Sequence, residues 1–227
     1  MRTIAVAAAL ALSLTPPALA QEVAASAVSC HFVARVYLNF NTLTAEVAGY
    51  ITDIPGITDS LFNGSPLSEQ NAFLTFRSDL VHLTPVNPNG VVNLFHVSAG
   101  NFNVYFNAHP NNDWSNPNSF SNGLPFDKSN PVVSLMRDQS LFFATDTLAR
   151  HDVTEHLISS QPFVLPSNGH QYDLGTFVPA GFTLYETYSN TSVGTPIPGF
   201  PSGTLPGAGN CAAVAATAAE GENQNQQ

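Results

Sequence analysis

The feature that most constrains the fold is a strict alternation of apolar and polar side chains over residues 101–108. Phe102, Val104, Phe106 and Ala108 occupy every second position, and Asn or Tyr fills the positions between them. Successive side chains of a strand point to opposite faces of a sheet, so this segment is predicted to be a strand with one buried and one solvated face. A helix would need a repeat near 3.6 residues, which is absent here.

Similar patterns recur along the chain at the spacing of an antiparallel β-protein. Turn-forming Gly, Pro and Asn residues separate many of these segments. The strand-like segments are residues 30–40, 44–52, 71–77, 80–84, 91–97, 101–108, 132–136, 140–146, 172–178 and 182–188. We therefore predict an all-β, single-domain antiparallel β-barrel, with a β-sandwich as the alternative, because both folds share this pattern.

Local residue types predict the structure of three other segments. A Gly-Asn pair within residues 98–101 predicts a tight hairpin between the strands on either side. Residues 148–158 fit either a continued strand or a single short helix, because neither face of a strand would be uniformly apolar. Residues 189–209 are rich in Gly, Pro and Thr and are predicted to be extended without forming a strand.

Residues 1–20 are predicted to be a secretory signal peptide. Arg2 precedes an apolar run from Ile4 to Leu14, and Ala18-Leu-Ala20 supplies a cleavage site. The run is too short to span a membrane, and no integral membrane segment is expected elsewhere. We predict an all-β domain at residues 21–211 and a disordered polar tail at 212–227, in a protein that is secreted, or periplasmic if the source is Gram-negative.

The charge of the chain restricts its partners. Six Lys and Arg residues stand against 16 Asp and Glu residues, for a formal net charge of −10. Nucleic acids and anionic membrane surfaces are bound by basic patches, so neither is an expected partner. A small apolar molecule or a glycan fits this composition better.

Two cysteines, Cys30 and Cys211, lie near the two ends of the predicted domain. Cysteines of a secreted chain meet an oxidising compartment, so we predict a disulfide between them. Two free buried thiols are the alternative.

The run from His151 to His156 is the densest group of potential metal ligands. His151, Glu155 and His156 are candidate ligands for a divalent metal, although a metal site needs three or four converging side chains. If the run is a strand, His151 and Glu155 share a face. Ordinary ion pairs between histidine and carboxylate are the alternative, and no other cofactor is expected. Known catalytic signatures are absent, but a serine triad is recognised by geometry and stays open.

The long polar segment from residue 109 to 127 contains the only tryptophan. Trp114 and Asp113 within it, together with Asn103 and Tyr105 on the preceding strand, are the candidate ligand-binding residues. The segment fits a calcium loop or a sugar-binding tip in which Trp114 stacks on the ring. The alternative is a rigid polar loop with Trp114 packed against the sheet.

Sixteen Phe and six Tyr residues supply aromatic faces that either line a cavity or fill the core. We expect a secreted, non-catalytic binding protein for a small apolar ligand or an extracellular surface. One alternative is an extracellular enzyme, metal-dependent or of the barrel-cavity type, that uses the His/Glu cluster. The other is a carbohydrate-binding module that acts through the Trp114 loop.

Overall fold

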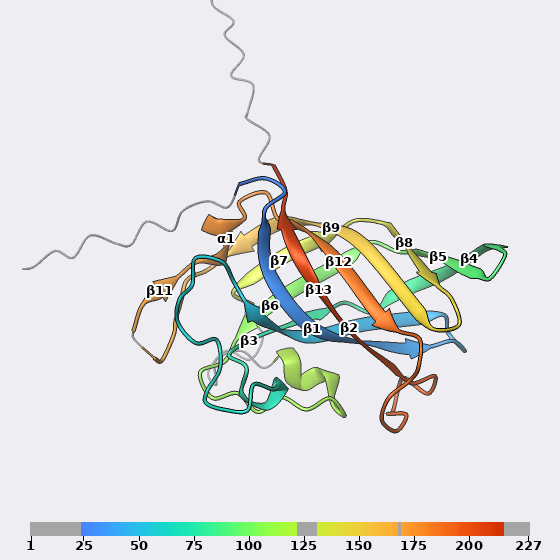
Figure 1. Cartoon of the computed structure of the whole chain (residues 1–227), viewed down its shortest axis with the longest axis horizontal. Coiled ribbons are helices and arrows are strands. Elements are labelled where there is room, and N and C mark those ends of the chain that lie inside the picture. The colour runs from blue at the N-terminus through green and yellow to red at the C-terminus, as the bar shows by residue number, and fades with distance from the viewer. Residues whose placement is uncertain (1–23, 122–130, 168, 216–227) are drawn as a thin grey trace, which may run out of the picture.

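The computed structural model describes residues 24–121, 131–167 and 169–215 (Figure 1). The predicted signal peptide lies outside the described residues, as does the predicted tail from residue 216 onward. The predicted tail began too early, because residues 212 and 213 belong to the last strand. No helix within the described ranges is long and apolar enough to cross a membrane.

Eight antiparallel strands of the described chain close into a barrel, as the alternation predicted. Strand β1 pairs with β2 on one side and with β13 on the other, which joins the two ends of the sheet. The ring consists of β1 (Val28–Asn39), β2 (Thr44–Asp53), β3 (Leu74–Ser78), β6 (Gly100–Phe106), β7 (Val133–Arg137), β9 (Leu148–Ser160), β12 (Phe182–Ser189) and β13 (Thr204–Ala213).

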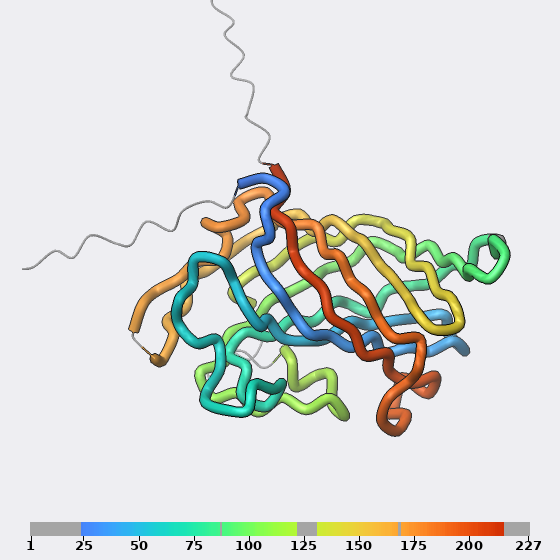
Figure 2. Tube along the Cα trace, viewed as in Figure 1, coloured from blue at the N-terminus to red at the C-terminus, as the bar shows by residue number. Residues whose placement is uncertain are grey.

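Three further strands extend this barrel: β4 (Val81–Asn89), β5 (Val92–Val97) and β8 (Ser140–Ala144). Strand β4 continues β3, β6 continues β5, and β8 continues β7. Where these strands pair with one another, the register is the same on both sides of the break: Ser78 is opposite Phe102, and five residues further on Leu83 is opposite Val97. The continuous trace is visible at the right of Figure 2, where the long green hairpin projects beyond the other strands. Counted this way, the fold is an eight-stranded up-and-down barrel in chain order.

The predicted hairpin at residues 98–101 was wrong. Strands β5 and β6 do not pair with each other, since each continues the other along the same neighbours. The turn lies instead at Asn89-Gly90, between β4 and β5, where Gly90 has a φ of 64°. Asn-Gly is the dipeptide that a type I′ hairpin turn prefers. Gly-Asn at 100–101 would suit a type II′ turn, but both residues belong to β6.

The breaks in the three long strands lie at one level and add one residue there. Arg137 is opposite Glu155 and Leu141 is opposite Asp152, so four steps along β7 and β8 face three steps along β9. An extra residue of this kind is a β-bulge, which changes the face on which later side chains lie. As a result, Asp138 and Gln139 are both exposed, and the side chain of Ser140 faces inward again.

One end of the barrel is closed by a short helix, α1 (Leu174–Phe177), where the alternation had predicted a strand over 172–178. Only β11 (Gln171–Tyr172) is extended there, and it pairs with β10 (Phe163–Val164). The side chain of Asp173 then accepts a hydrogen bond from the Gly175 amide at 3.0 Å, which caps the helix and stops the strand. Two 3₁₀ turns, η1 (Glu69–Asn71) and η2 (Pro117–Ser121), lie outside the barrel wall.

Two segments with ambiguous or weak strand signals are strands. Residues 148–160 form the long β9, which settles the choice between strand and helix. Residues 204–213 form β13, so the prediction that 189–209 contains no strand was wrong. Its glycines are required by packing, because a Cβ on Gly207 would lie 2.2 Å from the Tyr188 ring and a Cβ on Gly209 would lie 2.6 Å from the Phe32 ring. Low β-propensity was therefore a poor guide at this position.

The predicted disulfide is present. Cys30 and Cys211 are opposite each other in the ladder that closes the barrel, with their Cα atoms 4.9 Å apart. The bond ties the first strand to the last.

We expect the Cys30→Ala, Cys211→Ala double variant to lose about 2–5 kcal/mol of unfolding free energy, because the disulfide closes a very long loop in the unfolded chain. Urea denaturation followed by circular dichroism measures this loss. An unchanged midpoint would show that the β1–β13 ladder closes the barrel without help from the bond.

Gly49 of β2 is predicted to tolerate no side chain. A Cβ there would lie 2.2 Å from the Val33 carbonyl oxygen and 2.6 Å from the Phe76 ring. We expect Gly49→Ala to cost about 1–3 kcal/mol, as overpacking does in a filled core. Gly100→Ala is the matched control, because its Cβ would meet neighbours only at 3.5 Å or beyond. Equal denaturation midpoints for the two variants would contradict this account.

Candidate functional site: a buried polar cluster inside the barrel

The barrel interior contains a polar cluster on the wall formed by β7, β8, β9 and β12. In register, Arg137 is opposite Glu155 and His151 is opposite Glu186. These four side chains have relative exposures between 0% and 3%, and Ser140 beside them is half-buried. We call Arg137, Ser140, His151, Glu155 and Glu186 the interior cluster.

One half of the interior cluster is an ion pair that is only partly satisfied. Arg137 Nε donates to Glu155 Oε1 at 2.7 Å, and the guanidinium carbon lies 5.3 Å from the centre of the Phe102 ring. Arg137 Nη1 and Nη2 and Glu155 Oε2 have no hydrogen-bond partner among the described residues. Each buried polar group left without a partner costs roughly 1–3 kcal/mol, so an apolar core would be more stable here.

Burial and charge act in opposite directions on this pair. Burial raises the pKa of Glu155 to about 7, against the attraction of Arg137. Burial by itself would lower the pKa of Arg137, but the nearby carboxylates of Glu155 and Glu186 outweigh it and hold that pKa above its usual value. Arg137 therefore stays charged while Glu155 titrates near neutrality.

The other half of the interior cluster is a chain of hydrogen bonds. Ser140 Oγ lies 2.6 Å from His151 Nε2, and His151 Nδ1 lies 2.8 Å from Glu186 Oε2. In the tautomer that donates from Nδ1 to the Glu186 carboxylate, Nε2 accepts from the Ser140 hydroxyl. The buried Tyr188 lies close by, and burial followed by the charge of Glu186 raises the pKa of its hydroxyl.

Two small apolar cavities lie in the barrel interior, and the smaller of them is lined by members of the interior cluster. The larger, of about 40 Å³, lies toward α1 and is bordered by Phe102, Phe177 and Phe182 among other apolar side chains. The smaller, of about 20 Å³, lies toward β4 and β8, and Arg137 and His151 are its polar lining residues. A water molecule needs roughly 10–15 Å³ of such space, so each cavity in this conformation holds only very small groups.

The predicted metal ligands do not converge. His151 and Glu155 share the inner face of β9, as expected for a strand, but His156 is exposed on the other face and pairs with Asp138 at 3.0 Å. Among the described residues, no group of three His, Cys, Asp or Glu side chains is arranged to hold a metal ion. Metal binding at this run therefore stays a prediction without a ligand set.

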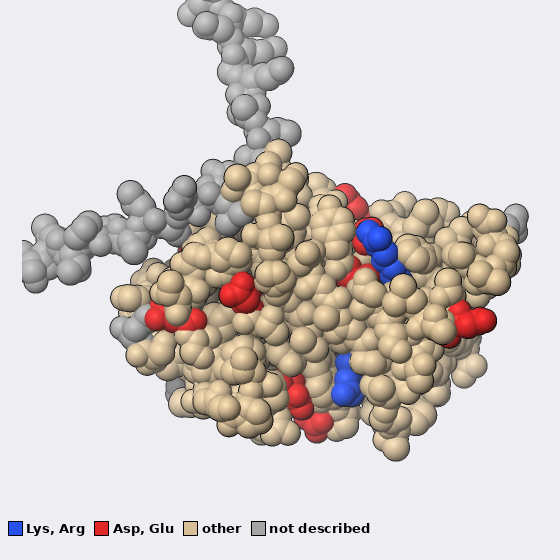
Figure 3. Space-filling model, in the orientation of Figure 1, with Lys and Arg blue, Asp and Glu red and all other residues tan. Residues whose placement is uncertain are grey.

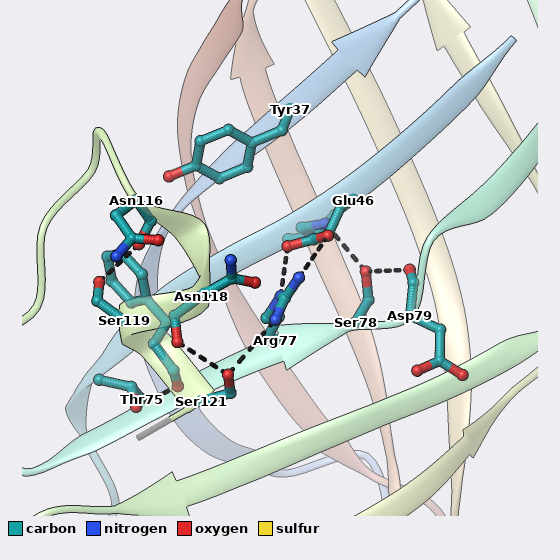
Figure 4. Close-up of polar contacts among 12 residues, drawn as sticks. Tyr37, Glu46, Thr75, Arg77, Ser78, Asp79, Asn116, Asn118, Ser119 and Ser121 are labelled. Atoms are coloured by element: carbon teal, nitrogen blue, oxygen red, sulfur yellow. Dashed lines mark hydrogen bonds and ion pairs between the residues drawn. The ribbon is translucent and has the colours of Figure 1, made fainter. Parts of the chain in front are cut away.

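The Trp114 loop packs against the outside of the barrel (Figure 4). The half-buried Trp114 ring lies 4.7 Å from the Phe120 ring and 5.9 Å from the Tyr50 ring, and the Arg35 guanidinium lies 4.6 Å from its centre. The Tyr37 hydroxyl donates to the Trp114 carbonyl at 3.1 Å. These contacts match the alternative of a polar loop with its tryptophan packed against the sheet, and Trp114 is partly buried there.

The same face holds a second ion pair, which anchors the loop. Figure 4 shows Arg77 pointing at Glu46, with Arg77 Nη2 donating to Glu46 Oε2 at 2.9 Å. Arg77 Nη1 also reaches Ser121 Oγ at 3.4 Å, and Thr75 Oγ1 donates to the Phe120 carbonyl at 2.7 Å. The loop is thus attached to β3 by side chains of the sheet.

The other three predicted binding residues are dispersed around this loop. Asn103 and Tyr105 lie on the outer face of β6, which is separated by β3 from the strands that Trp114 contacts. Tyr105 is buried, which raises its pKa. Asp113 is exposed and accepts hydrogen bonds from the Ser115 amide and hydroxyl at 2.8 and 2.7 Å. Charged side chains are sparse on the face drawn in Figure 3.

Three members of the interior cluster, Arg137, Ser140 and Glu186, were missed by sequence reasoning. A signal for Glu186 was present, because it occupies the apolar face of its strand between Leu184 and Tyr188. A charged residue in such a position is rarely buried without a partner. No comparable signal existed for Ser140, since the bulge that turns it inward is not visible in the alternation.

Comparisons with known proteins provide no further guide, because no family model, curated protein or solved structure matches this chain.

The raised pKa of Glu155 predicts a pH dependence of stability. Between its ordinary value of 4.5 and about 7, this carboxyl is protonated in the folded state and ionised in the unfolded state. The contribution of this carboxyl to the free energy of unfolding is therefore fully present below its ordinary pKa of 4.5 and is lost as pH rises through about 7. The total change is on the order of 3 kcal/mol. We expect Glu155→Gln to flatten the dependence of the urea midpoint over roughly pH 5 to 8. Asp152→Asn, on the exposed face of β9, is the control, and an unaltered slope in Glu155→Gln would contradict the assignment.

Proposed function

We propose that this chain is a secreted binding protein that holds a small, mainly apolar molecule with one polar group inside the barrel. The observation that carries the proposal is the interior cluster, in which several buried polar atoms have no partner among the described residues and the surrounding interior is mainly apolar. Such atoms destabilise the fold, and unsatisfied polar groups beside apolar cavities are typical of sites that recognise a ligand.

The chemistry of the unpaired atoms favours a neutral polar group on the ligand. Among the described residues, Arg137 Nη1 and Nη2 require an acceptor, whereas Glu155 Oε2 requires a donor. A hydroxyl group both accepts and donates. A carboxylate would be attracted to Arg137 but repelled by the glutamates, so an apolar alcohol fits the interior cluster better than a fatty acid.

Entry of such a ligand requires movement of the closed end. Leu174, Phe177 and Val178, in and just after α1, border the larger cavity. The helix is a single turn of four residues, and the cavity it covers has only about 40 Å³. Displacement of α1 would join this cavity to solvent. Phe102, which borders the cavity, lies 5.3 Å from the Arg137 guanidinium carbon, so a ligand in this space would need movement of the Phe102 ring to reach the interior cluster.

The reporter N-phenyl-1-naphthylamine, which fluoresces in apolar surroundings, tests the proposal. We expect the reporter to bind saturably. The concentration of 1-octanol that displaces half of the reporter should be at least about tenfold lower than that of octanoate, because a tenfold difference in affinity corresponds to about one charge-assisted hydrogen bond. The Arg137→Met, Glu155→Leu double variant replaces both ionic partners by apolar groups, a change that buried pairs often tolerate. It should bind the reporter but lose the preference for the alcohol.

Arg150→Met is the matched control, because Arg150 is exposed on the outer face of β9 and pairs with Asp152. It should retain the wild-type preference. Reporter fluorescence that does not saturate, or an octanol preference that survives in the double variant, would refute binding at the interior cluster.

A further inference from the structure

We propose that Ser140, His151 and Glu186 form a catalytic triad that hydrolyses short-chain carboxylic esters, with Ser140 as the nucleophile. This activity goes beyond ligand binding. A triad requires a serine hydroxyl within hydrogen-bond distance of an imidazole, and that imidazole within the same distance of a carboxylate. Ser140 Oγ lies 2.6 Å from His151 Nε2, and His151 Nδ1 lies 2.8 Å from Glu186 Oε2.

The local fold explains why these three groups meet. His151 and Glu186 are direct partners in the β9–β12 ladder, and both side chains point into the barrel. Ser140 is the first residue of β8, immediately after the bulge that separates it from Arg137. Bulges are common beside active sites because they redirect a side chain, and this one brings the serine hydroxyl to the free nitrogen of the imidazole.

The surroundings suit the charge that develops in ester hydrolysis. Arg137 and His151 line the same cavity of about 20 Å³, and Arg137 Nη1 and Nη2 are donors without a protein partner among the described residues. Such donors are suited to bind the oxyanion of a tetrahedral intermediate. The other side chains around this cavity are Ala, Val and Leu residues and Phe142. Because the cavity holds only very small groups, an acyl group beside Ser140 would need these side chains to move apart, which favours a short one.

The reaction follows from these positions. Ser140 Oγ forms a bond to the ester carbonyl carbon while His151 Nε2 takes the hydroxyl proton. The bond to the alcohol oxygen then breaks, and the alcohol leaves with that proton. A water molecule, deprotonated by the same nitrogen, attacks the acyl-serine, which releases the carboxylic acid and restores the hydroxyl. Glu186 touches neither substrate nor water and is a positioning residue, which holds the imidazole in the tautomer that accepts at Nε2.

The first test uses methanesulfonyl fluoride, which transfers its sulfonyl group to an activated serine oxygen with loss of fluoride and a proton. Intact-mass and peptide analysis of the folded wild-type protein should show one adduct, on Ser140. Ser140→Ala should show none. Ser134→Ala, which removes a half-buried hydroxyl from the adjoining strand β7, should be labelled like the wild type.

The second test measures hydrolysis of p-nitrophenyl acetate. We expect Ser140→Ala to lower kcat by about 100-fold or more, and Glu186→Gln to lower kcat strongly with little change in KM, because it alters the imidazole and leaves the acyl site intact. Circular dichroism melts confirm that each variant is folded. A wild-type protein that is unlabelled at Ser140, or an esterase rate that survives in folded Ser140→Ala, overturns the triad. Neither readout depends on the naphthylamine reporter, so failure of the triad and failure of ligand binding are distinguishable.

Discussion

Closure of the sheet is the constraint on which the other features depend. Because β1 pairs with both β2 and β13, the ring has no open edge and the inner face of each strand is removed from water. The disulfide lies on this closing ladder and ties its two strands. Any polar side chain that points inward must then find its partners among other inward side chains, which gives the interior cluster both its cost and its chemical interest.

The aligned bulges are the second determinant of the site. In a regular strand, side chains three positions apart lie on opposite faces, so Arg137 and Ser140 could not both point into the barrel. The added residue changes the face after the break, while the pairing of β7 and β8 with β9 is kept on both sides. The guanidinium of Arg137 and the serine hydroxyl thus both reach one wall of the interior. A proposed ligand site and a proposed nucleophile both depend on this one irregularity.

Sequence reasoning succeeded where a local rule was sufficient. The alternation predicted a β-barrel, and two cysteines behind a predicted signal peptide predicted the disulfide. Strand geometry predicted that His151 and Glu155 would share a face. It failed where packing overrode local preference: Gly207 and Gly209 are in a strand because aromatic rings occupy the space of their missing side chains. It also failed at residues 98–101, where a turn signal belonged to a bulge inside a continuous strand.

By itself, the sequence determined the fold class and the face of most side chains, because a repeat of two is a property of neighbouring residues. Only the tertiary structure decided which polar groups meet. Glu186 is 35 residues from His151 in the chain, and the register of β9 with β12 places them 2.8 Å apart. Ser140 joins them only because of a bulge. Register and bulges are set by the packing of the whole closed sheet, and for that reason no short stretch of residues contained the site.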